Sequence, residues 1–98
     1  MNASTTPRSA KPPILMTGMY QGSAVELEWQ PGRWCTLRTK PAAPNLSIGL
    51  SNILGFKPAL KYEDPRGYSV WEWHLVDLNA RWQAIQGNPA FGKLEKLK

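Results

Sequence analysis

The fold is decided by a hairpin pattern in residues 25–39, VELEWQPGRWCTLRT, which places a Pro-Gly turn between two alternating segments. Apolar residues at every second position are typical of a strand with one buried face. A two-residue loop would pair Trp29 with Trp34, whereas a three-residue loop pairs Trp29 with Cys35. We predict the second register, because an L-Pro-Gly turn has the wrong twist for the tightest hairpins and because this register gathers the apolar residues. The predicted core face consists of Val25, Leu27, Trp29, Cys35 and Leu37.

The opposite face of this hairpin carries an aromatic ring among cations. Proteins that bind single-stranded nucleic acid stack bases on exposed rings and neutralise phosphates with neighbouring Arg and Lys. The alternative is that Trp34 covers a second apolar patch and that Arg38 pairs with Glu26 across the strands. The candidate binding residues on this face and at its turn are Arg33, Trp34, Thr36, Arg38 and Lys40.

Two further elements are predicted around the hairpin. Residues 14–21 form an additional strand before it. Residues 45–56 form a short helix after it, with Asn45 as the N-cap and Gly55 at its end. Gly49 weakens this helix by roughly 1 kcal/mol relative to Ala.

The segment after the helix fits two structures. Residues 59–63 and 68–75 flank Asp-Pro-Arg-Gly, a composition typical of a four-residue turn, and so predict a second hairpin. Ser69 and Glu72 also form a capping box, which would start a helix there instead. We favour the strand, because the second segment is rich in β-branched and aromatic residues. In either interpretation a helix runs from Asp77 or Leu78 to Gln86 and is closed by Gly87.

Together these elements predict an α+β fold. We expect a small antiparallel sheet of about four to five strands in two hairpins, packed with one or two short helices. A chain of 98 residues is the size of one domain. We assign that domain to residues 14–87, with a flexible N-terminal tail over 1–13 and a loosely held basic segment over 88–98.

Composition narrows the location and the kind of partner. No apolar run reaches the length of about 18 residues that a membrane span needs, and none resembles a signal-peptide core. A secreted domain this small would usually carry paired cysteines, whereas this chain has one. We therefore expect a cytoplasmic protein without a membrane partner. Its net charge of +5 favours nucleic acid or an acidic protein as the partner.

The sequence contains no recognisable motif for catalysis or cofactor binding. One His and one Cys cannot form a tetrahedral zinc site, so we expect no metal. Cys35 and His74 could form a nucleophile–base pair, but we interpret Cys35 as a core residue and His74 as an outward polar residue. The glycines are isolated and form no phosphate-binding loop. We expect no cofactor, no small-molecule substrate and no enzymatic activity.

The sequence thus predicts a small, basic, non-catalytic binding module. The first hypothesis is nucleic-acid binding, with single strands favoured, through the face that carries Trp34, Arg38 and Lys40. The alternative is a protein-interaction module (an adaptor, inhibitor or accessory subunit) that uses exposed aromatic residues.

Overall fold

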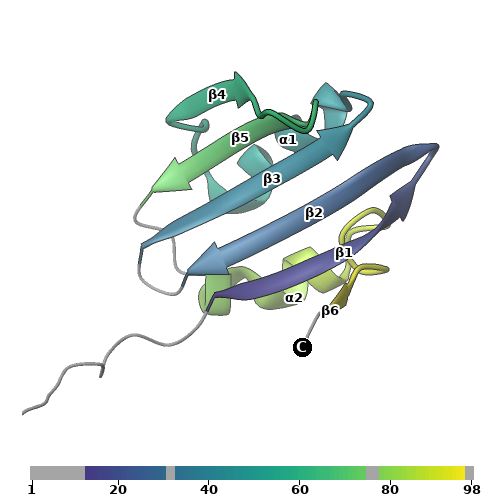
Figure 1. Ribbon diagram of the computed structural model, residues 1–98. Coiled ribbons are helices and arrows are strands. Elements are labelled where there is room, and N and C mark those ends of the chain that lie inside the picture. The colour runs from purple at the N-terminus through teal and green to yellow at the C-terminus, as the bar shows by residue number, and fades with distance from the viewer. Residues whose placement is uncertain (1–12, 31–32, 75–77, 97–98) are drawn as a thin grey trace, which may run out of the picture.

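The computed structural model describes residues 13–30, 33–74 and 78–96 (Figure 1). Residues 1–12, which make up most of the tail expected over 1–13, lie outside this range, as do the turn residues 31–32, residues 75–77 and residues 97–98. The described residues form a six-stranded sheet with two short helical regions, which confirms the α+β class and adds one strand to the number expected.

All strand pairs in the sheet are antiparallel, and the spatial order is β4-β5-β3-β2-β1-β6. Consecutive hairpins account for most of this order, and β5 joins the two halves by pairing with β3. The strands are β1 (Ile14–Tyr20), β2 (Ser23–Gln30), β3 (Trp34–Lys40), β4 (Leu60–Glu63), β5 (Ser69–His74) and β6 (Glu95–Lys96).

The β2–β3 hairpin has the register predicted from its turn. Trp29 faces Cys35 and Leu27 faces Leu37. The Arg33 N–H donates to the Gln30 carbonyl at 3.0 Å and closes the loop. A one-residue slip would have moved every apolar side chain to the other face of the sheet. The predicted core face of the hairpin is confirmed, because all five of its members are buried: Val25, Leu27, Trp29, Cys35 and Leu37.

Helix α1 (Pro44–Leu54) corrects one detail of the sequence prediction. The helix begins at Pro44 with Ala43 as the N-cap, and no side chain caps it, so Asn45 does not have the predicted role. Proline suits the first helical position because its φ is already fixed and its missing N–H needs no partner there. Gly55 ends the helix as predicted, with φ at +90° and its N–H donating to the Ser51 carbonyl at 2.7 Å.

The C-terminal third of the chain completes the core. β4 and β5 form the favoured second hairpin, and a 3₁₀ turn, η2 (Leu78–Arg81), leads into the short helix α2 (Trp82–Gln86). Within the segment 88–98, which the sequence predicts to be loosely held, Ala90 and Phe91 are buried and β6 pairs with β1. Ala90 and Phe91 therefore contribute to the core, and β6 (Glu95–Lys96) contributes to the edge of the sheet.

Both helices lie on one face of the sheet, with α1 behind β3 and β5 and α2 behind β1 and β2 (Figure 1). The core fills the space between the two layers and contains three buried tryptophans, Trp29, Trp71 and Trp73. Trp29 also stacks on Trp82 of α2, with ring centroids 6.3 Å apart. No described helix covers the other face, which we call the outer face.

Candidate binding surfaces

The outer face holds four of the five residues singled out from the sequence. Trp34, Thr36, Arg38 and Lys40 alternate along β3 with buried positions, so they point away from the helices. Trp34 and Arg38 are half-buried, and Lys40 is exposed. Thr36 is buried between neighbouring strands, which leaves little of it accessible to a partner. Arg33 is exposed in the preceding turn.

Carboxylates surround Arg38 on this face. Its Nη1 lies 3.2 Å from Glu26 Oε1, and its Nη2 lies 2.5 Å from Glu28 Oε1. The pairing of Arg38 with Glu26 that the sequence offered as an alternative is therefore confirmed. Glu72 of β5 faces Thr36 from the other side of β3. The centre of the outer face thus places three carboxylates, those of Glu26, Glu28 and Glu72, around the Arg38 guanidinium.

Lys40 also has partners within the chain. Its Nζ donates to the Arg66 carbonyl at 2.7 Å and lies 5.8 Å from the centroid of the Tyr68 ring. The Arg66 side chain extends from the β4–β5 turn toward β2. Its Cζ lies 4.4 Å from the centroid of the Tyr68 ring, and its Nη2 lies 3.0 Å from Glu26 Oε1. These contacts join the β4–β5 turn to β2 and β3. They also give Lys40 and Arg66 partners within the chain.

Cys35 and His74 do not form a catalytic pair. Cys35 points into the core and is fully buried, and burial raises the pKa of its thiol to about 12. His74 faces Trp34 on the outer face and is exposed, with its Nε2 3.5 Å from Glu72 Oε1. The two side chains lie on opposite faces of the sheet, because adjacent positions across β3 and β5 alternate. Both structural interpretations made from the sequence are confirmed.

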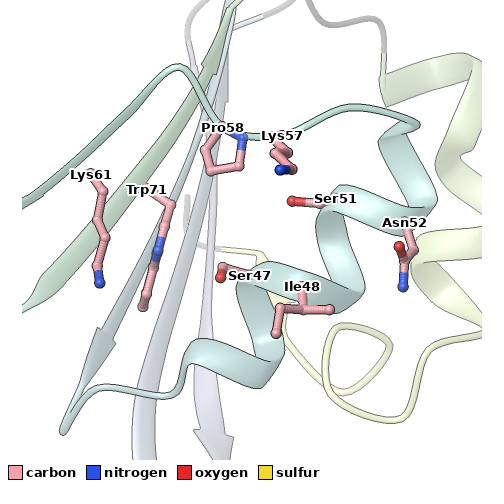
Figure 2. A pocket seen from close by; sticks show the side chains of 8 residues that line it. All are labelled: Ser47, Ile48, Ser51, Asn52, Lys57, Pro58, Lys61 and Trp71. Carbon is pink, nitrogen blue, oxygen red and sulfur yellow. The ribbon is translucent and has the colours of Figure 1, made fainter.

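A second surface, which the sequence did not reveal, lies between α1 and the β4–β5 hairpin. It contains a pocket of about 370 Å³ (Figure 2). Helix side chains form one wall, Trp71 and Lys61 form the other, and the segment that follows the helix closes one end. We call this surface the α1–β4 groove; it is lined by Ser47, Ile48, Ser51, Asn52, Lys57, Pro58, Lys61 and Trp71.

The groove combines an apolar surface with positive charge. Ile48 is 62% exposed at its rim, and Phe56, nearby in the chain, is 46% exposed. Lys57 and Lys61 are the ionisable lining residues, and Lys61 Nζ lies 5.8 Å from the Trp71 ring centroid. None of the lining residues is a carboxylate. The groove therefore carries positive charge without carboxylates, whereas carboxylates predominate at the centre of the outer face.

Strand β4 borders the groove and is itself accessible. It is the outermost strand on its side of the sheet, and all four of its residues are exposed. Leu60 and Tyr62 project to the outer face at 49% and 47% exposure. Tyr62 Oη donates to Glu72 Oε2 at 2.5 Å, and this hydrogen bond raises the pKa of Tyr62.

Sequence reasoning missed the groove because its residues come from three separate segments. The one available signal was Ile48, an apolar residue that lies away from the buried stripe of Leu46, Leu50 and Leu54 on the same helix. An apolar residue on the solvent side of a helix is common, however, and does not by itself identify a binding surface.

Comparison with protein-family models, with curated proteins and with solved structures found no match. Within the described residues, no three His, Cys, Asp or Glu side chains gather that could hold a metal ion. The same part of the chain has no helix long and apolar enough to cross a membrane. The two surfaces are therefore the features of the molecule from which a function can be inferred.

Proposed function

We propose that the chain is a non-catalytic, cytoplasmic module that binds a partner protein through the α1–β4 groove. The observation that carries this proposal is the apolar pocket between α1 and β4, with the exposed side chain of Ile48 at its rim. Contiguous exposed apolar surface next to polar residues marks interaction sites, because isolated globular domains otherwise keep such patches small. Burial of the exposed Ile48 side chain would supply the driving force for binding.

The charges on the outer face support a protein partner over nucleic acid. A phosphate that approached Arg38 would compete with Glu26 and Glu28, which already contact the guanidinium. The same carboxylates would repel the phosphate backbone of a strand stacked on Trp34. Binding of single-stranded nucleic acid through Trp34, Arg38 and Lys40 stays a prediction, and we place it second.

Capture of partners from the native cell, with and without nuclease, tests the proposal. We expect a protein partner that is retained after nuclease treatment and lost with Ile48→Asp, which places a charge at the rim of the groove. Ile48 is largely exposed, so this variant should fold normally. Trp34→Ala is the matched control on the outer face and should retain the partner. Loss of the partner with nuclease, or with Trp34→Ala and not with Ile48→Asp, would contradict the proposal.

A further inference from the structure

On the basis of the proposed function, we infer that the partner supplies an extended acidic segment that pairs with β4 as an additional strand. The structure places an open strand edge beside an apolar pocket with two lysines in its lining. Addition of a strand provides affinity through backbone hydrogen bonds, while pockets for alternate side chains provide specificity. The α1–β4 groove and the β4 edge together meet both requirements.

The backbone of β4 has groups available for this pairing. The Asp64 N–H donates to the Tyr68 carbonyl at 2.9 Å across the turn. Because hydrogen-bonded positions alternate in an antiparallel pair, Tyr62 directs its backbone groups toward β5. Lys61 and Glu63 then direct their N–H and C=O groups to the open side. Such unpaired groups form a template for an incoming strand.

The same alternation determines where the side chains of the partner go. A partner residue opposite Lys61 would have its side chain on the face covered by α1, beside the pocket. Its neighbours in the segment would project to the outer face, next to the exposed Leu60 and Tyr62. The segment should therefore carry an apolar side chain at the position that enters the pocket.

Charge favours carboxylates around that apolar residue. Lys57 and Lys61 belong to the lining of the groove, which contains no carboxylate. Both lysines are within reach of a segment that lies along β4, and the net charge of +5 also attracts an acidic partner. We assign these carboxylates to Asp and Glu side chains within the partner segment.

A second copy of the chain fits this edge less well. Pairing of β4 with β4 would satisfy the backbone, but the residues that β4 projects toward α1 are Lys61 and Glu63. Two charged side chains would then lie over an apolar pocket and leave it unfilled. Lys61 of one copy could pair with Glu63 of the other, but the pocket would still receive no apolar side chain, so an apolar residue from another protein is the better occupant.

The experiment uses a library of random dodecamer peptides displayed on phage and selected against the full chain. We expect enrichment of segments with Asp or Glu flanking an apolar residue. The affinity of a selected peptide, synthesised with a fluorescein label, is then measured by anisotropy. Lys61→Glu should lower this affinity about tenfold or more, because the charge of the contact is reversed. The same measurement on Lys93→Glu, outside the groove, controls for net charge.

Strand addition itself is tested with a pair of variants at Glu63. Glu63→Pro removes an N–H that faces the open side, and proline is tolerated in an edge strand at such a position. We expect Glu63→Pro to lower the affinity for the peptide by about fivefold to tenfold, the effect of one lost hydrogen bond. Glu63→Ala removes the same carboxylate but keeps the N–H, and should bind as tightly as the wild type or more tightly. Circular dichroism checks that both variants are folded.

The outcomes separate the inference from the proposed function. If peptides bind and are sensitive to Ile48→Asp, but Glu63→Pro and Glu63→Ala behave alike, the groove binds its partner without strand addition and the inference is overturned. Selection of neutral or basic segments, or a dimer in sedimentation that Glu63→Pro dissociates, also overturns it. The proposed function fails separately, if neither a selected peptide nor a captured partner responds to Ile48→Asp.

Discussion

The guanidinium of Arg38 contacts Glu28 at an Nη2–Oε1 distance of 2.5 Å, in the middle of the outer face. Both side chains are about one-fifth exposed, and a second carboxylate, that of Glu26, completes the cluster. Partial burial reduces the screening of these charges by solvent relative to a fully exposed pair. Arg38 therefore stabilises the pairing of β2 with β3. Because its charge is neutralised by Glu26 and Glu28, it would attract a phosphate only weakly.

This arrangement gives a direct test of nucleic-acid binding. We expect Arg38→Ala to leave unchanged the slope of log affinity against log salt for single-stranded DNA, because no phosphate contact is lost. The measurement is quenching of tryptophan fluorescence over a series of salt concentrations. A slope that falls by about one unit would show that Arg38 contacts a phosphate and would favour the outer face as the binding surface.

A second prediction concerns the stability of the hairpin that organises the sheet. Leu27→Ala should lower the free energy of unfolding by about 2–4 kcal/mol, because the side chain is fully buried and its loss leaves a cavity. Urea denaturation measures the change. Met19→Ala is the matched control on β1, where the side chain is 65% exposed, and should change the stability by less than about 0.5 kcal/mol. Equal effects of the two substitutions would contradict the assignment of the core.

Local patterns predicted most of the strands because each depends on side chains close together in the sequence. The alternation around Trp29 and the length of its turn determine the β2–β3 register without information from other segments. The choice of strand over helix for residues 69–74 was correct for a similar reason, since β-branched and aromatic residues pack well on a pleated surface.

The elements that were missed depend on tertiary packing. Strand β6 has two residues, too few to show a periodic pattern, and it pairs with β1, which lies far from it in the sequence. Phe91 is buried because the turns before β6 fold back under the sheet. The α1–β4 groove has the same origin, because its walls meet only when β4 pairs with β5 beneath the helix.

A third prediction follows from the buried thiol of Cys35. Burial raises its pKa from 9.0 to about 12, so between these pH values the unfolded chain has released a proton that the native chain retains. The contribution of this group to stability is complete below pH 9.0 and falls as the pH rises toward 12, by up to about 1.4 kcal/mol per pH unit. Urea denaturation at pH 8 to 11 should show a steeper loss for the wild type than for Cys35→Ala. Parallel curves would mean that Cys35 is accessible to water.

The last prediction uses two glycines with opposite surroundings. A Cβ at Gly92 would lie 2.2 Å from the backbone oxygen of Gln86, and backbone cannot move aside as a flexible side chain can. Gly92→Ala should therefore destabilise the protein by about 1–3 kcal/mol, the usual cost of overpacking. A Cβ at Gly49, within α1, would come no closer than 3.9 Å to a neighbour, the Nδ2 atom of Asn88. Gly49→Ala should stabilise the protein by about 0.5–1 kcal/mol, because alanine restricts the unfolded chain and favours the helix. Thermal and urea denaturation of both variants measures the two effects. If Gly92→Ala were neutral, Gly92 would not lie as close to the backbone oxygen of Gln86 as the geometry indicates. If Gly49→Ala were destabilising, the side of α1 that faces Asn88 would have less room than its geometry indicates.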